Sequence, residues 1–550
     1  MQHMEMLFRF VGGLGMFLYG MNVMADGLQK SAGGKMKHLL EFLTKNRLMG
    51  ILVGAGVTAI IQSSSATTVM VVGFVNAGII NLTQAVGVIM GANIGTTITA
   101  WIVSMSEWGS MLKPEFFAPL LIGIGAFMML FSKKEKAREA SEILIGFGVL
   151  FIGLSFMSGA ISPYRDAPIF AKAFQVLGSN PILGILTGLV VTAIIQSSSA
   201  SVGILQTLAA NGVVTWNSAI YITLGQNIGT CVTALLSSLG AHRTAKRAAV
   251  IHLLFNVIGA VVFGVLMFVL FTLNKTWAGA NINSVEISIF HTIFNVTNTA
   301  LLYPFANWLV KMSDVIVKGQ DEVEEEEDIC ELPHLDERIL ESPSFAVESA
   351  VKEVVRMGEL AIRHAELAFD AVRTGSQKRV DKAYKIEETM NEYEKQMAEY
   401  LAKISKTSLN EKQRLIIGDL LYTVSDIERM SDHCDNIVEL AENLIRENMR
   451  FSMEAMQGFD EITGLTLDAM KASILARQTE KMAYVQQVVQ IEDEIDDLEE
   501  DLRSQHIDRL ARNQCSAAKG VFFLDMLSNI ERISDHANNV AGYVADESEA

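Results

Sequence analysis

The tetrapeptide Gln-Ser-Ser-Ser occurs twice in this chain, at 62–65 and 196–199, and each copy interrupts an apolar run. Four polar side chains inside an apolar segment are costly in lipid, so we expect them to lie within protein or to line a cavity. If the helix breaks there, the second arm begins with unpaired backbone N–H groups and the positive end of a helix dipole. Two such N-termini, with serine hydroxyls as added donors, are suited to binding an anion. The candidate anion ligands are Ser63, Ser64, Ser65, Ser197, Ser198 and Ser199.

Oxygen atoms suited to a hard cation lie close to the same tetrapeptides. A helix break frees the backbone carbonyls of Gln62 and Gln196, and hydroxyl groups are available at Thr96, Thr97 and Thr230. Hard cations such as Na⁺ prefer oxygen ligands. No Lys or Arg lies near either tetrapeptide in the sequence, so we expect coupled cations to neutralise the anion. Helix packing is the alternative role for these serines, and a serine hydrolase is disfavoured because no Gly-x-Ser-x-Gly motif is present.

The tetrapeptides belong to a longer internal repeat. Residues 57–104 and 191–238 align without a gap, and 20 of the 48 positions are identical. The identical positions include Asn-Ile-Gly-Thr at 93–96 and 227–230. Glycines 13, 15 and 20 also match glycines 146, 148 and 153. Each copy therefore reads as helix, hairpin and helix, over about 8–105 and about 141–239, with extra apolar helices at 117–131, 246–273 and 286–310.

The apolar arms on either side of each tetrapeptide are short. Segments 48–61, 66–80, 181–195 and 200–214 have about 15 residues each, or roughly 22 Å of helix. A hydrocarbon core is roughly 30 Å thick, so one arm does not cross it. We therefore predict two re-entrant hairpins with a tetrapeptide at each tip. Two ordinary helices held by polar contacts are the alternative.

The order of the apolar segments predicts that the second copy is inverted. The chain crosses the membrane three times between the starts of the two copies, at 6–28, 85–105 and 117–131. Lys and Arg gather in 29–47, 132–140 and 240–247, which fall on one side of the membrane, and the positive-inside rule makes that side cytoplasmic. The hairpins then enter from opposite faces and their tips can meet near the midplane. This is the architecture of an alternating-access transporter.

Two histidines lie within the apolar segments of this half. His252 and His291 are each followed one helical turn later by an asparagine, Asn256 or Asn295. We interpret both histidines as packing residues, and a proton relay is the alternative.

Charge divides the 550-residue chain near residue 310. Residues 1–310 have a net charge of +7, and residues 311–550 have a net charge of −25. We expect an all-α membrane domain over 1–310, an acidic linker over 311–343 with the run Glu324–Asp328, and a soluble helical domain over 344–550. The acidic half argues against a nucleic-acid partner. The four cysteines are scattered and predict neither a zinc site nor a disulfide framework.

The soluble half has helical apolar spacing and five breaks, which predict six helices in two three-helix bundles. The third helix of each set carries two acids one turn apart, Glu428 and Asp432 in one set and Glu531 and Asp535 in the other. Acids of the second helices, such as Glu387, Glu388, Glu492 and Asp493, could complete an oxygen-rich metal site. A solvated acidic surface is the alternative.

The paired Gln-Ser-Ser-Ser motifs, each followed by Asn-Ile-Gly-Thr in a repeat, resemble the type II sodium-dependent phosphate cotransporters. The resemblance covers about residues 8–310. It implies a phosphate substrate, Na⁺ as coupling ion and a site built from both tips. It also implies that Asn93, Thr96, Thr97, Asn227 and Thr230 face the tips as sodium ligands, with Gln62 and Gln196. Cys231 stands where the first copy has Thr97, which leaves the number of Na⁺ sites open.

The soluble half resembles the PhoU family of phosphate-signalling regulators. The resemblance is carried by Glu-Arg-x-Ser-Asp-His at 428–433 and 531–536, and it covers about residues 344–545. It implies a cytoplasmic regulatory domain with a divalent or iron-type metal at the acidic pairs, and phosphate-signalling proteins as partners.

Together these features predict a sodium-coupled phosphate transporter of the plasma membrane, the inner membrane of a bacterium, and not an enzyme. A sodium-independent phosphate exporter and a phosphate sensor are the alternatives. The sequence leaves open whether the protein is a monomer or a homodimer.

Overall fold

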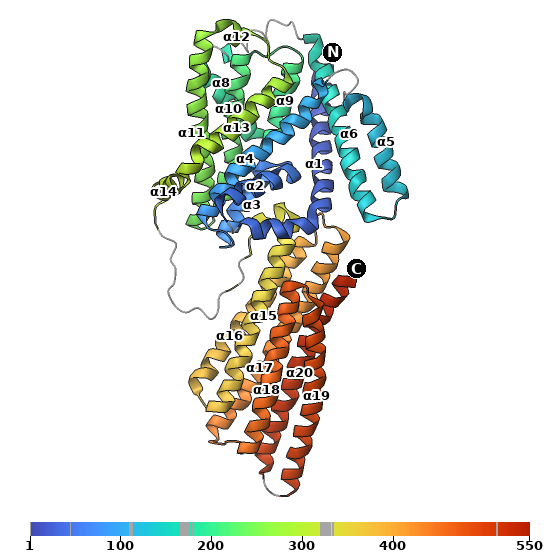
Figure 1. The fold of residues 1–550 in the computed structure, drawn as a ribbon, viewed down its shortest axis with the longest axis vertical. Helices are drawn as coiled ribbons and strands as arrows, with labels where there is room; N and C mark the ends of the chain where they lie inside the picture. Colours follow the sequence, from blue (N-terminus) through green and yellow to red (C-terminus); the bar gives the residue numbers. More distant parts are fainter. Residues whose placement is uncertain are drawn as a thin grey trace. The chain divides into compact units, whose positions relative to one another are not determined.

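The computed structural model describes residues 2–43, 46–108, 114–164, 176–177, 180–319, 332, 335–512 and 515–549. Within these ranges the regular structure is helical, apart from one isolated bridge between Thr215 and Asn281 (Figure 1). The prediction of an all-α chain is therefore confirmed. The acidic run Glu324–Asp328 and the segments 109–113 and 165–175 lie outside the described residues.

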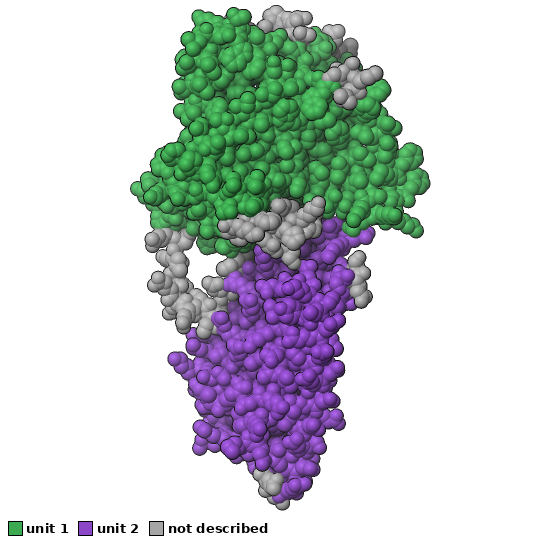
Figure 2. All heavy atoms as spheres, in the orientation of Figure 1, with its two compact units in different colours: residues 1–323, 336–345 green, residues 324–335, 346–550 purple. Residues whose placement is uncertain are grey.

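The chain divides into two compact units (Figure 2). Unit 1 contains residues 1–323 and 336–345, and unit 2 contains residues 324–335 and 346–550.

Unit 1 contains the two helical repeats and the extra apolar helices. Its helices are α1 (Gln2–Leu43), α2 (Arg47–Ile61), α3 (Ser64–Asn76), α4 (Leu82–Ser104), α5 (Pro114–Phe131), α6 (Glu135–Ile161), α8 (Pro181–Ile195), α9 (Ser198–Ala210), α10 (Trp216–Ser237), α11 (Arg243–Leu273), α12 (Lys275–Gly279), α13 (Ser284–Leu302) and α14 (Ala306–Ile316). Among the described residues, six helical segments are long and apolar enough to cross a membrane: 4–32, 82–107, 114–131, 135–161, 216–237 and 243–273. The predicted segment 286–310 is divided instead, because a short 3₁₀ turn, Tyr303–Phe305, separates α13 from α14.

Glycines allow corresponding helices of the two repeats to approach closely. A Cβ atom added to Gly91 of α4 would lie 2.0 Å from the Ile51 carbonyl oxygen of α2. The matching Gly225 of α10 is 1.9 Å from the Ile185 carbonyl oxygen of α8 by the same construction. Only a residue without a side chain fits at either position.

The first helices of the two repeats, α1 and α6, pack against each other in opposite directions. A Cβ added to Gly13 would lie 2.8 Å from the Gly153 carbonyl oxygen, and one added to Gly20 would lie 2.6 Å from that of Gly146. The later residue of α1 therefore meets the earlier residue of α6, so the two helices are antiparallel.

Apolar side chains form the interior of unit 1 and also cover parts of its outer surface. One buried cluster joins α9, α10, α11 and α13 through residues such as Leu205, Leu224, Phe263 and Phe294. In contrast, α5 exposes 77% of Phe116 and 77% of Phe131. An outer face of this kind is suited to contact with lipid.

The end of the predicted linker packs within unit 1. The 3₁₀ helix η4 (Glu337–Glu341) lies against α3, where a Cβ on Gly73 would be 3.2 Å from Ile339. The ring of Phe345 meets that of Phe74 edge to face at 5.5 Å, and both residues are buried. The segment Asp336–Phe345 is thus an ordered part of unit 1, and α15 begins within it.

Unit 2 contains the six predicted helices: α15 (Pro343–Thr374), α16 (Gln377–Ile404), α17 (Glu411–Arg446), α18 (Met453–Thr479), α19 (Met482–Ala511) and α20 (Ala517–Glu549). The third helices of the two sets, α17 and α20, pack on each other. Asp426 of α17 accepts hydrogen bonds from His536, Asn539 and Tyr543 of α20. A buried bidentate ion pair between Arg477 and Glu547 joins α18 to α20.

Candidate functional site

Both tetrapeptides break a helix in the same way. Gln62 ends α2 with φ 56° and ψ 22°, and Gln196 ends α8 with φ 55° and ψ 23°. This left-handed conformation is uncommon for a residue other than glycine. Ser63 and Ser197 then cap the next helices, because their hydroxyl oxygens accept bonds from the N–H groups of residues 66 and 200 at 3.1 and 3.2 Å. Each break therefore leaves a new helix N-terminus at the predicted position.

The two breaks meet inside unit 1. The hydroxyl oxygens of Ser64 and Ser198 lie 3.3 Å apart. The hydroxyl of Ser199 donates to the backbone carbonyl of Gln62 at 3.4 Å. Since Ser64 and Ser198 are the first residues of α3 and α9, two helix N-termini converge at this contact. Helix N-termini attract anions through their N–H groups and their dipoles.

The surroundings of this contact are buried and carry few charges. Ser64, Ser65, Ser198 and Ser199 are all buried. The helices α3, α4, α8, α9 and α10 contain no Asp, Glu, Lys or Arg at all. A bound anion would therefore be stabilised by N–H groups, hydroxyl groups and any accompanying cation, and not by a fixed positive side chain.

The two glutamines have different surroundings although their sequence context is the same. Gln62 is buried, and its Oε1 accepts a hydrogen bond from the Thr99 hydroxyl at 3.0 Å. Its Nε2 donates to the carbonyl of Ala59. The side chain of Gln196 is exposed. The predicted cation ligands are the backbone carbonyls of these two residues and not their side chains. The backbone has the same conformation at both residues.

The predicted cation ligands of α4 and α10 are buried and use their donor groups within their own helices. Asn93 and Asn227 donate through Nδ2 to the carbonyls of residues 89 and 223 at 2.8 and 2.9 Å. Thr96 and Thr230 each donate to the carbonyl four residues earlier at 3.0 Å. Thr97 donates to the carbonyl of residue 94 at 2.7 Å. Because these bonds use the donor atoms, the side-chain oxygens keep lone pairs that can bind a cation.

Helices of both repeats pack around α3 and α9, the helices that follow the two breaks. Helix α3 contacts α10 as well as α4, and α9 contacts α4 as well as α10. Each Asn-Ile-Gly-Thr helix therefore packs against the tip-bearing arms of both repeats.

Cys231 is directed toward α11. Its Sγ lies 3.4 Å from Nδ2 of Asn256 and 3.5 Å from the carbonyl oxygen of His252. The thiol is fully buried. The substitution of cysteine for threonine at this position thus replaces a hydroxyl with a group that contacts α11.

Unit 2 brings acidic side chains of its second and third helices together. One carboxylate oxygen from each of Glu492, Asp496 and Asp535 lies within 4.8 Å of the others. The sequence singled out Asp493, but Asp496 completes this group because it lies one helical turn after Glu492 on the same face. Burial, followed by repulsion from Asp535, raises the pKa of Glu531 beside them.

Acidic side chains also lie near one another in the first set of helices. Burial raises the pKa of Glu428 to about 7, and repulsion from Asp432 and Glu394 adds to the increase. The pKa of Glu387 is raised by burial and then by repulsion from Asp432. Mutual repulsion of this kind favours either a bound proton or a bound cation.

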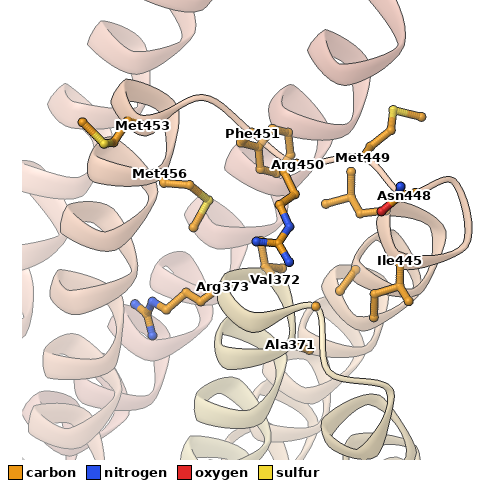
Figure 3. A pocket seen from close by; sticks show the side chains of 13 residues that line it. Ala371, Val372, Arg373, Ile445, Asn448, Met449, Arg450, Phe451, Met453 and Met456 are labelled. Carbon is orange, nitrogen blue, oxygen red and sulfur yellow. The ribbon is translucent and has the colours of Figure 1, made fainter.

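A cavity in unit 2 is separate from these acidic groups. It has a volume of about 360 Å³ and lies where α15 and α17 end and α18 begins. Figure 3 shows the Arg450 side chain extending toward Val372, while Arg373 extends away. Arg373 is paired with Asp460 at 2.5 Å and Thr463 at 2.8 Å. The sequence offered no motif for this cavity.

Long apolar helices around two meeting helix breaks define a membrane protein of the transporter class. The family profile described as Na⁺/Pi-cotransporter matches residues 16–159 and 167–291. The profile of the PhoU domain matches residues 354–441 and 459–544. The chain belongs to the Na⁺/Pi-cotransporter family, whose members are phosphate transporters and not enzymes, and it carries PhoU domains in its second half.

Two proteins named for phosphate transport are similar to this chain. The putative inorganic phosphate export protein YjbB of Escherichia coli K12 is 24% identical over 544 residues, which cover 98% of both chains. The human sodium-dependent phosphate transport protein 2B is 34% identical over 113 residues, which cover 20% of this chain and 16% of the relative. PhoU from Pseudomonas aeruginosa superposes with a TM-score of 0.36 and 18% identity, over 37% of this chain and 97% of the other.

Proposed function

We propose that this protein moves inorganic phosphate across the plasma membrane by alternating access, coupled to Na⁺. The contact between Ser64 and Ser198 carries the proposal, because it joins two helix N-termini in a buried, uncharged environment. Phosphate is a small anion that accepts several hydrogen bonds, and such a site offers N–H groups and hydroxyls together.

The phosphate ligands in this proposal are the N–H and hydroxyl groups of the two tips: Ser63, Ser64, Ser65, Ser197, Ser198 and Ser199. Sodium is held by oxygens beside them: the backbone carbonyls of Gln62 and Gln196 and the side chains of Asn93, Thr96, Thr97, Asn227 and Thr230. The absence of Lys and Arg from α3, α4, α9 and α10 supports cation coupling, since Na⁺ then supplies the positive charge.

The two repeats are inverted in this proposal, and the hairpins re-enter the membrane from opposite faces. Support comes from the pairing of Gly13 with Gly153 and of Gly20 with Gly146. Gly13 corresponds to Gly146 in the repeat, and Gly20 corresponds to Gly153. If each glycine is replaced by its counterpart, the pair Gly13–Gly153 becomes the pair Gly146–Gly20, as expected for two antiparallel helices related by a two-fold axis. The arms α2, α3, α8 and α9 have 15, 13, 15 and 13 residues, which is short for a full crossing.

Phosphate export is a second candidate. It is favoured by the likeness to a putative phosphate export protein over 98% of both chains, whereas the sodium-dependent relative matches a fifth of this chain. For either direction of transport, we propose that the PhoU domains are cytoplasmic and regulate the phosphate flux. A divalent or iron-type metal is bound there by Glu428 and Asp432 and by Glu531 and Asp535.

Labelled phosphate flux in proteoliposomes tests these assignments. An inward Na⁺ gradient should accelerate phosphate entry, and replacement of Na⁺ by K⁺ or collapse of the gradient with an ionophore should abolish the acceleration. Flux that ignores Na⁺ would contradict coupling and favour the exporter. Tight phosphate binding without any flux would favour a sensor.

A further inference from the structure

His291 is a fully buried residue of α13 that contacts a predicted cation ligand. Its Nε2 lies 3.3 Å from Oδ1 of Asn227, and its side chain is 1% exposed. The amide orientation of Asn227 is fixed by the bond from its Nδ2 to the Thr223 carbonyl at 2.9 Å. An amide oxygen can only accept, so Nε2 of His291 carries the hydrogen and donates it to Asn227.

Other contacts hold α13 in place on either side of this bond. One turn earlier, Ser288 donates to the Ala100 carbonyl of α4 and accepts from Gln206 of α9, both at 2.9 Å. At the next residue, Thr292 accepts a hydrogen bond from the indole N–H of Trp101 at 2.9 Å. These bonds come from both repeats, so the imidazole is presented to Asn227 from a fixed helix.

The two repeats differ at this point. Asn93, the counterpart of Asn227, makes the same bond to its own helix but has no histidine partner among the described residues. His291 lies outside both repeats, between residues 239 and 310. The second repeat therefore has an additional buried donor directed at its asparagine oxygen.

We propose that His291 is a positioning residue for the cation-binding oxygen of Asn227, a role that rests on the proposed sodium coupling. The donated hydrogen bond fixes the direction in which Oδ1 presents its remaining lone pair. Without it, Oδ1 would be buried with one partner fewer, and the side chain could turn away from a bound cation. This role replaces the interpretation of His291 as a packing residue.

The test is phosphate uptake as a function of Na⁺ concentration in proteoliposomes. His291→Leu should raise the Na⁺ concentration for half-maximal uptake by about 5- to 10-fold, which corresponds to the loss of one hydrogen bond. The KM for phosphate at saturating Na⁺ should change by less than about 2-fold. His291→Gln keeps an N–H donor of similar reach and should restore most of the Na⁺ response.

Asn295→Leu is the matched control, because Asn295 is buried one turn further along α13. Within the described part of the chain its Nδ2 donates only to the carbonyl of His291. This variant should keep the wild-type Na⁺ response. The inference would be overturned by a wild-type Na⁺ response in His291→Leu. It would also be overturned by equal losses in the Leu, Gln and Asn295 variants, which indicate a general packing role. Wild-type uptake that ignores Na⁺ would instead refute the coupling itself, and with it any sodium-positioning role.

Discussion

Ser64 and Ser198 stand 134 residues apart in the chain, yet their hydroxyl oxygens lie 3.3 Å from each other at the starts of two helices. They occupy the same position in the two repeats. In the inverted arrangement that we propose, a contact between equivalent residues lies on the axis that relates the repeats, and a ligand bound there would be shared by both tips.

A disulfide across the tips should form and stop transport. In the double variant Ser64→Cys, Ser198→Cys the sulfur atoms replace oxygens 3.3 Å apart, a separation that a small side-chain adjustment converts to a disulfide. We expect oxidant to abolish the phosphate flux that the reduced double variant retains, and a reductant to restore flux to that level. Ser64→Cys alone is the control and should not respond to mild oxidant. Full flux in the oxidised double variant, with the disulfide verified by mass spectrometry, would contradict a tip that binds substrate.

Gly91→Ala should impair folding far more than Gly56→Ala does. A methyl group at Gly91 would lie 2.0 Å from the Ile51 carbonyl oxygen, whereas one at Gly56 meets nothing within 4 Å. The helices α2 and α4 would have to separate, and we expect an overpacking penalty of about 1–3 kcal/mol or more. The yield of monodisperse protein and its melting temperature in detergent measure the difference. Equal stability of the two variants would show that α2 and α4 do not pack as described.

Phe345→Ala should destabilise unit 1. Phe345 is fully buried against Phe74, and truncation of a buried phenylalanine typically costs about 3–5 kcal/mol. Phe131→Ala is the control, because that ring is 77% exposed. Hydrogen exchange of α3 should accelerate in the first variant only. Unchanged exchange would mean that the segment Asp336–Phe345 does not hold α3.

The sequence predicted the helix breaks well because their signal is local and occurs twice. It did not predict that Gln62 is buried and Gln196 exposed. Gln62 accepts a hydrogen bond from Thr99 of its own repeat, whereas the hydroxyl of Thr233, the counterpart of Thr99, is buried without a hydrogen-bond partner among the described residues. The bond between His291 and Asn227 depends on α13, which has no counterpart in either repeat. Asp496 was missed in favour of Asp493, although the period of 3.6 residues places Asp496 on the face of Glu492.

The sequence also did not predict that the segment Asp336–Phe345 packs within unit 1. The acidic run before it and the proline at its end are typical of a spacer, and only the contact of Ile339 with Gly73 of α3 shows otherwise. Contacts of this type depend on the tertiary arrangement and leave no periodic pattern.

Without a bound metal, unit 2 should lose protection against hydrogen exchange as the pH rises toward neutrality. Burial and repulsion from Asp432 raise the pKa of Glu428 from its usual 4.5 to about 7. A raised pKa means that the folded state binds the proton more tightly, so the stabilisation is complete below about pH 4.5 and is lost as pH passes 7. Hydrogen exchange of α16 and α17 in the full-length protein, corrected for intrinsic rates, should show this decline.

A divalent cation should reverse that decline by taking the place of the proton. Mn²⁺ should restore protection of α16 and α17 at pH 7.5 but have little effect at pH 5. Glu428→Gln removes the titrating group, and we expect it to flatten the pH response and weaken the Mn²⁺ effect. Protection that is independent of both pH and Mn²⁺ would favour a solvated acidic surface without a metal.

The central claim, that one phosphate is held by both tips, is tested most directly by a double-mutant cycle of phosphate uptake. Ser64→Ala and Ser198→Ala should each reduce kcat/KM by about 10-fold or more, since a hydrogen bond to a charged group is worth about 1.5–3 kcal/mol. Both variants should insert normally, and the double variant should lose less than the sum of the two free-energy changes, because the residues share one ligand. Wild-type uptake in either single variant, or strictly additive losses in the double variant, would contradict a shared site.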